Sequence, residues 1–102
     1  MSPIEKAARN LCRAHGEDEE DISTGAPRWT IYLPQVMSVI DALHEPSLSM
    51  KEAGLEVIRH VGKGESDAGY RSDAANVWRF MVDVLRQDGR HKLAAITTRA
   101  AK

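Results

Sequence analysis

The stretch from Trp29 to Gly54 reads WTIYLPQVMSVIDALHEPSLSMKEAG, and it decides the fold. Its apolar residues recur at three- and four-residue spacing over Val36–Leu43, which is the period of an amphipathic helix. Pro34 favours a helix start, because proline is tolerated in the first turn but not further in. Pro46 ends the same helix, because the residue before a proline is biased out of helical dihedrals. The stretch therefore predicts a short aromatic turn followed by a helix over Pro34–Leu43.

The N-terminal residues carry the signature of another helix start. Ser2 is a candidate N-cap, Pro3 falls at the first helical position and Glu5 at the third, which makes a capping box. Gly16 is the expected left-handed terminator of this helix. One face of the helix is apolar at helical spacing, at Ile4, Ala8, Leu11 and Cys12.

Two more helices are expected in the second half of the chain. The first runs over about residues 47–60 and through Gly54, although glycine inside a helix costs about 1 kcal/mol relative to alanine. Residues 62–70 contain three glycines and are predicted to form a flexible link. The last helix is expected to begin near residues 72–73 and to end at Gly89.

The whole pattern predicts an all-α protein. Period-two alternation and hairpin dipeptides, the signals of strands, are missing from the sequence. We expect residues 1–89 to form a single compact bundle of four helices. Residues 90–102 form a basic tail that is either frayed or folded as a short fifth helix. The predicted core consists of Ile4, Ala8, Leu11, Cys12, Trp29, Leu33, Val36, Ile40, Leu43, Met50, Val57, Val61, Val77, Trp78, Met81 and Leu85.

Length and composition place the chain among small cytoplasmic proteins. Its 102 residues make one domain. Cys12 is the only cysteine, so an internal disulfide is impossible. No run approaches the roughly 20 apolar residues that span a bilayer, and the N-terminus lacks the apolar segment of a secretory signal. We expect no membrane contact and no cofactor.

The charges are divided unevenly along the chain. Residues 1–70 have seven Lys or Arg against twelve Asp or Glu, whereas residues 71–102 have seven against three. This division indicates either internal complementarity, which we favour, or a basic surface for nucleic acid. Acidic residues lie among the basic ones and weaken the attraction for phosphate. The candidate nucleic-acid contacts are Arg71, Arg79, Arg86, Arg90 and Lys92.

Candidate chemistry in the sequence is sparse. Cys12 and His15 could share a helix face, but Cys12 lies on the apolar stripe, where a cysteine is usually a small core residue. The acidic run at residues 17–21 lacks the alternating ligands and central glycine of a calcium loop. We therefore predict no catalytic and no metal-binding residues. Trp29 and Tyr32 are either core residues or contacts for a partner.

These observations favour a small non-enzymatic interaction or accessory protein over an enzyme. Its partner would be another protein or a second copy of the chain, with nucleic acid a weaker candidate. The alternative is a helical DNA-binding accessory factor that uses the basic C-terminal third.

The order of the motifs resembles that of a group of short proteins from alphaproteobacteria and their phages or prophages. The likeness covers roughly residues 4–85, and its members have no known function, so it implies no site residues. It implies a bacterial, phage-derived cytoplasmic protein. This chain differs from the group because it keeps an apolar stripe at residues 55–61 and has a basic tail. The motifs that carry the likeness are AARxLCRxxG at 7–16, WxxYxP at 29–34, ALxxPSxxMxxAG at 42–54 and VWRxMVD at 77–83.

Overall fold

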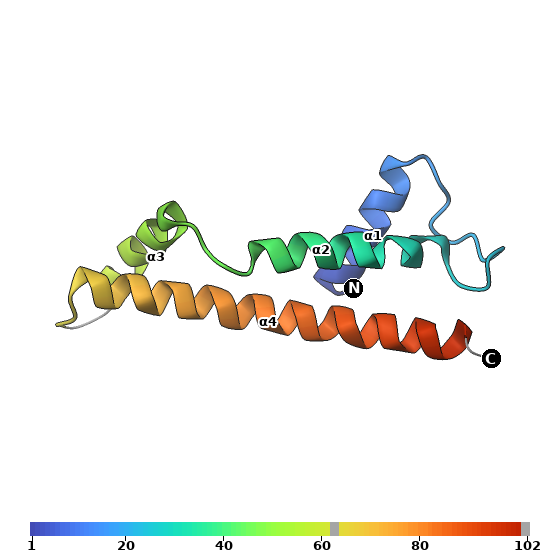
Figure 1. The fold of residues 1–102 in the computed structure, drawn as a ribbon. Coiled ribbons are helices and arrows are strands. Elements are labelled where there is room, and N and C mark those ends of the chain that lie inside the picture. Colours follow the sequence, from blue (N-terminus) through green and yellow to red (C-terminus); the bar gives the residue numbers. More distant parts are fainter. Residues whose placement is uncertain (62–63, 101–102) are drawn as a thin grey trace. The chain divides into compact units, whose positions relative to one another are not determined.

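The structure, a computed structural model, describes residues 1–61 and 64–100. Within these ranges the regular elements are all helical, which confirms the all-α class and the four helices (Figure 1). A short 3₁₀ helix, η1, precedes the second α-helix. The elements are α1 (Pro3–Ala14), η1 (Arg28–Tyr32), α2 (Leu33–Leu43), α3 (Leu48–Val61) and α4 (Asp67–Ala100).

The chain divides into two compact units. Unit 1 combines Met1–Asp41 with Leu85–Lys102, and unit 2 consists of Ala42–Val84. Unit 1 therefore contains α1, η1, most of α2 and the C-terminal part of α4. Unit 2 contains α3 and the N-terminal part of α4.

The first helix begins and ends as its sequence predicts. Ser2 is the N-cap, and its Oγ accepts a hydrogen bond from the backbone N–H of Glu5 at 3.2 Å. The Glu5 carboxylate pairs with Arg9 at 3.1 Å, one turn further along the helix. Gly16 lies just past the helix with φ of 73°, a conformation that favours glycine because it has no Cβ.

The aromatic turn and the helix after it also follow the prediction. Trp29 and Tyr32 lie in η1, and Pro34 is in the first turn of α2, where its missing N–H costs no hydrogen bond. Thr30 anchors the turn, because its hydroxyl donates to the Pro27 carbonyl at 2.7 Å. Local punctuation thus determines this part of the fold.

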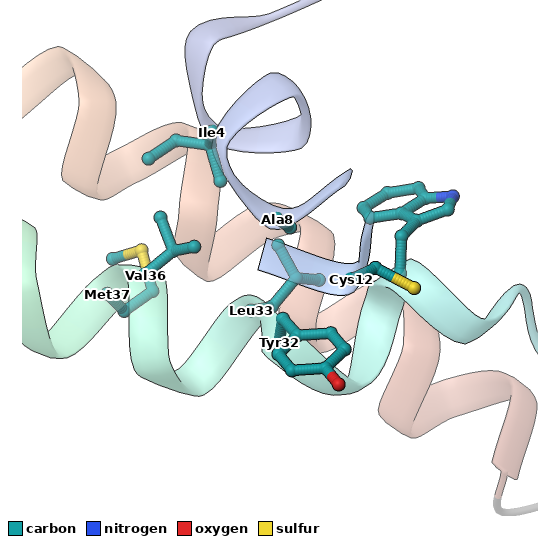
Figure 2. Packing of buried hydrophobic residues seen from close by; sticks show 8 residues of the cluster. Ile4, Ala8, Cys12, Tyr32, Leu33, Val36 and Met37 are labelled. Atoms are coloured by element: carbon teal, nitrogen blue, oxygen red, sulfur yellow. The ribbon is translucent and has the colours of Figure 1, made fainter. Parts of the chain in front are cut away.

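The core of unit 1 is formed where α1, η1 and α2 meet (Figure 2). Side chains of the C-terminal part of α4 pack against it, among them Leu85 and Leu93. The core includes Met37 and Tyr32, which the predicted core lacks, whereas Leu11 and Ile40 are only partly buried. The buried residues are Ile4, Ala8, Cys12, Trp29, Tyr32, Leu33, Val36 and Met37.

The prediction that the last helix ends at Gly89 is wrong, because α4 continues through it to Ala100. Gly89 is buried in the helix. A Cβ built there would lie 1.9 Å from Sδ of Met37. This glycine therefore allows α2 and α4 to approach closely, rather than ending a helix. The segment predicted as a frayed tail or a fifth helix is part of α4 as far as Ala100.

The same helix also begins earlier than predicted, at Asp67. Ser66 caps it, because its Oγ accepts a hydrogen bond from the Gly69 N–H at 3.1 Å. Asp67 suits the first turn, where a negative charge is stabilised by the helix dipole. Of the predicted link, residues 62–63 lie outside the described ranges.

The third helix runs through Gly54, as expected. Ser47 caps it and accepts a hydrogen bond from the Met50 N–H at 3.2 Å. Gly54 faces α4, where a Cβ on it would lie 2.6 Å from the Cβ of Ala74. The absent side chain thus lets α3 and α4 pack closely.

The predicted core is wrong over much of unit 2. Leu43, Met50, Val57, Val77 and Met81 are exposed, with relative exposures between 37% for Met50 and 68% for Val57. The buried apolar side chains among the described residues of this unit are instead Pro46, Leu55, Tyr70, Ala75 and Val82. The apolar face of α4 is broad, and α3 covers only part of it. The side chain of Val61, also predicted in the core, lies outside the described part.

Candidate interaction surface

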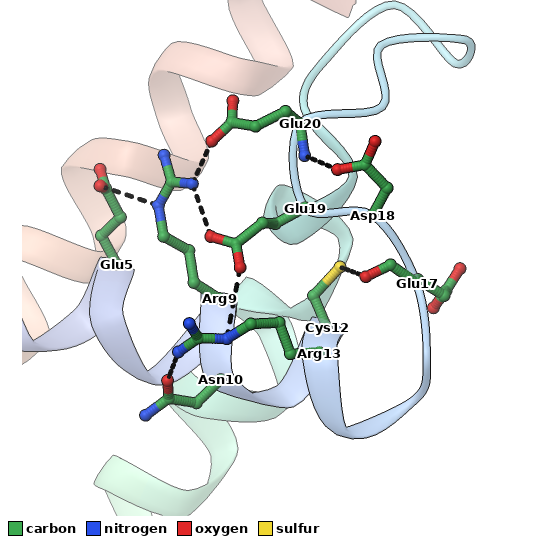
Figure 3. Close-up of polar contacts among 9 residues, drawn as sticks. All are labelled: Glu5, Arg9, Asn10, Cys12, Arg13, Glu17, Asp18, Glu19 and Glu20. Carbon is green, nitrogen blue, oxygen red and sulfur yellow. Dashed lines mark hydrogen bonds and ion pairs between the residues drawn. The ribbon is translucent and has the colours of Figure 1, made fainter.

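The acidic run after α1 is bound to arginines (Figure 3). Arg9 pairs with Glu19 at 2.9 Å and with Glu20, and Arg13 reaches Glu19 at 3.3 Å. The hydrogen bonds that Arg9 donates to the carboxylates of Glu20 and Glu19 raise the pKa of Arg9 above its ordinary value. The run is therefore not a freely solvated loop, and its carboxylates neutralise basic side chains of α1.

A second polar contact ties the loop to η1. The Glu17 carboxylate accepts a hydrogen bond from the Tyr32 hydroxyl and pairs with Arg28. The bond from Tyr32 lowers the pKa of Glu17, with Arg28 adding to the effect. The same bond raises the pKa of Tyr32 to about 12, because the carboxylate favours the protonated phenol. These contacts hold the loop against the core of unit 1.

Cys12 and His15 are not arranged as a nucleophile and its base. The Cys12 side chain is fully buried, and its thiol donates a weak hydrogen bond to the Glu17 carbonyl at 3.8 Å. Burial raises the pKa of this thiol, which disfavours the reactive thiolate. The His15 ring instead stacks on Tyr32, with 5.1 Å between centroids.

Both aromatic residues named as possible partner contacts belong to the core. Trp29 is 8% exposed and Tyr32 is 5% exposed. The guanidinium of Arg9 also covers the Trp29 ring, 5.0 Å from its centroid, in a cation–π contact. Trp29 also lines a small pocket of about 170 Å³ beside Pro27 and Lys92, so its role as a partner contact stays a prediction.

The candidate nucleic-acid contacts are distributed along α4, and four of the five have a carboxylate beside them. Arg71 pairs with Glu52, and Arg79 with Glu45 at 2.9 Å. Arg86 pairs with Asp41 at 2.8 Å and Lys92 with Asp88 at 3.7 Å, while Arg90 is exposed. Paired in this way, the basic side chains attract phosphate less strongly than free ones would.

The strongest candidate site is an apolar groove in unit 2, between α3 and α4. It encloses about 260 Å³. The α3 wall presents Met50, Gly54 and Val57, at positions i, i+4 and i+7. The α4 wall presents Ala74, Val77 and Met81, at positions i, i+3 and i+7. Each wall is thus one side of an amphipathic helix that no other described element of unit 2 covers.

The apolar surface extends from the groove along α4. Phe80 and Val84 are 68% and 64% exposed, beside Val77 and Met81 at 53% and 60%. We name Val77, Phe80, Met81 and Val84 the α4 ridge. Scattered single apolar residues are normal on a protein surface, but a contiguous exposed patch marks an interaction site.

Polar contacts hold the end of the groove in place. The indole N–H of Trp78 donates to the Leu43 carbonyl at 2.7 Å. One residue further along α4, Arg79 binds the Glu45 carboxylate. Pro46, which follows Glu45 in the chain, lines the groove. The link between Leu43 and α3 is thereby fixed against α4, which keeps the groove wall in place.

Sequence reasoning identified only part of this surface and assigned that part to the core. Val57, Val77 and Met81 belong to the predicted core, whereas Phe80 and Val84 were not singled out. The spacing 77, 80, 81, 84 is itself a helical stripe and could have revealed the α4 ridge. The sequence alone does not show which of two adjacent apolar stripes on α4 is covered by α3.

Other kinds of site find little support in the described residues. Among them, no group of three or more His, Cys, Asp or Glu is placed to hold a metal ion. Likewise, none of the helices they form has the length and apolar character needed to cross a membrane. The chain matches no family model, and searches of curated proteins and of solved structures found no match.

Proposed function

We propose that the chain is a small non-enzymatic interaction protein that binds a protein partner through the unit 2 groove and the α4 ridge. One observation carries the proposal: apolar side chains at helical spacing line both walls of an open groove and continue onto the α4 ridge. Helix-in-groove recognition uses such a surface, with anchors at i, i+3, i+4 and i+7.

A protein partner fits this surface better than nucleic acid does. Among the described residues that line the groove, Lys51 is the one that carries a charge. Nucleic-acid interfaces are instead strongly basic and polar, because most of their affinity comes from phosphate contacts. The ion pairs of Arg71, Arg79 and Arg86 further weaken the DNA-binding alternative.

The setting of this function rests on sequence alone. The resemblance to alphaproteobacterial and phage proteins supports a bacterial, prophage-derived accessory role in the cytoplasm. A non-enzymatic role is supported by the burial of the Cys12 thiol, which was the best candidate nucleophile.

Site-specific photo-crosslinking in extracts of the native host tests the proposal. A benzophenone amino acid replaces Val77 in the groove or, as the matched control, Val39 on α2. The two valines are similarly exposed, at 53% and 57%, but Val39 lies in unit 1. We expect defined protein crosslinks from position 77 and background labelling from position 39. Equal labelling at the two positions, or none at 77, would contradict the proposal.

A further inference from the structure

We infer that the groove binds a second copy of this chain, so that two unit 2 surfaces pair about a twofold axis. The inference rests on the proposed function and names its partner. Each copy would contribute a groove and an α4 ridge, and together they would cover the apolar surfaces that each leaves exposed.

Unit 2 is small and buries few of its apolar side chains. It has the 43 residues from Ala42 to Val84, with two main helical segments. Domains below about 40 residues usually need disulfides, metals or oligomerisation for stability, and unit 2 is only slightly larger than that limit. The described part of the unit holds no metal-ligand cluster, and the sequence has only one cysteine, which lies outside it. Oligomerisation is one way in which such a small unit gains additional core.

The exposed apolar area of unit 2 approaches the area that a stable dimer buries. Val57 and the four residues of the α4 ridge are between 53% and 68% exposed. Taking on the order of 150–200 Å² for a fully exposed residue of this size, they present about 500–600 Å² of mostly apolar surface. A standard interface buries about 800 Å² on each partner. The partly exposed groove walls extend the surface toward that size.

The charges of unit 2 do not oppose the pairing of two copies. Residues 42–84 carry five Lys or Arg and seven Asp or Glu, so each copy brings a net charge of only −2. Arg59 and Arg71 pair with carboxylates of their own unit, Asp67 and Glu52. The surfaces that would meet are apolar, and two copies could approach with little like-charge repulsion.

The shape of the unit 2 surface favours a second copy over an unrelated partner, because this surface is complementary to itself. A twofold interface uses the same patch on both chains, so that patch must be complementary to itself. Unit 2 offers a concave groove and a convex α4 ridge side by side on α4, and Val77 and Met81 belong to both. Two α3/α4 pairs joined in this way supply the four apolar stripes of a four-helix bundle core.

Sedimentation equilibrium of the full chain tests the inference, from micromolar to millimolar concentration. We expect the wild type to move from the mass of the 11.3 kDa monomer to twice that mass. Val77→Glu places a charge in the interface and should raise the dimer Kd at least about tenfold. Val39→Glu, the same change at a similarly exposed site outside unit 2, should leave Kd unchanged. A monomer at all concentrations, or equal weakening by both changes, overturns the inference.

A crosslinking experiment covers the case in which Val77→Glu fails to fold. In a Cys12→Ser background, Val77→Cys and Val39→Cys are oxidised separately. Position 77 should form a covalent dimer at least about tenfold faster than position 39, because only the former lies in the paired surface. Equal rates contradict the twofold pairing. If the chain stays monomeric while the photo-crosslinker at 77 still captures another protein, the second copy is excluded and the proposed function stands; if it captures nothing, both fail.

Discussion

The close packing of α3 on α4 makes a quantitative prediction for Gly54→Ala. The new Cβ would lie 2.6 Å from the Cβ of Ala74, whereas carbon atoms prefer about 3.5–4.0 Å. Because Ala74 cannot move without its helix, we expect an overpacking cost of about 1–3 kcal/mol. Alanine gains about 1 kcal/mol over glycine in a helix. The free energy of unfolding should therefore fall by about 0–2 kcal/mol, where an unhindered site would show a rise.

The reciprocal substitution isolates the contact between the two helices. Ala74→Gly alone should cost about 1 kcal/mol in helix propensity. Combined with Gly54→Ala, it moves one methyl group from α4 to α3 and removes the clash, so the double variant should be close to the wild type. The double-mutant cycle should then give a coupling of about 1–3 kcal/mol in favour of the pair.

Urea unfolding followed by circular dichroism measures all four chains. Protein concentration must be held constant, because self-association makes the measured stability depend on it. The denaturant slope should stay the same, since the surface exposed on unfolding does not change. Additive effects of the two substitutions, or a more stable Gly54→Ala, would refute the close approach of α3 and α4.

Three further predictions concern unit 1. Gly89→Ala should lower the free energy of unfolding by about 0–2 kcal/mol, because its Cβ would meet the Met37 sulfur at 1.9 Å while alanine gains about 1 kcal/mol over glycine in a helix; a raised urea midpoint would show that Met37 repacks without cost. Cys12 should react slowly with a thiol reagent in the folded chain and quickly in urea, and equal rates would show that it is exposed. The stabilisation from Tyr32 should be complete below its unfolded pKa of about 10 and should be lost as pH rises toward its folded pKa of about 12. The stabilisation from Glu17 should be complete above its unfolded pKa of about 4.3 and should be lost as pH falls through its lowered folded pKa. The stability difference between the wild type and Tyr32→Phe should thus be largest between those limits, and a difference independent of pH would refute the hydrogen bond to Glu17.

Local punctuation made much of the fold predictable. Ser2, Gly16 and Pro34 act through the backbone of their own neighbourhood, so their consequences can be read without knowing the tertiary contacts. Gly89 defeated the same reasoning. Its role depends on Met37, which is distant in sequence, and a glycine needed for close packing looks like a helix terminator when only its neighbours are considered.

The acidic run shows a second limit of sequence reasoning. Its composition is that of a solvated loop, yet Glu17 is bound to Tyr32 and Glu19 to Arg13. Three arginines occur at ordinary positions of α1 and η1, and only the folded chain shows that they converge on this loop. Charge patterning predicted internal complementarity between the two halves of the chain. Several pairs do form between distant segments, such as Arg86 with Asp41.

The misassigned core of unit 2 carries the functional argument. A helical stripe such as that of Val77 and Met81 records a requirement for burial without specifying what provides it. In unit 1 the matching stripes of α1 and α2 meet elements of the same chain, and the predicted residues are buried or, like Leu11 and Ile40, partly buried. In unit 2 the described elements cover only one side of α4, and the rest of its apolar face remains exposed. This exposed stripe, which the sequence predicts to be buried, is the observation on which the proposed protein partner rests.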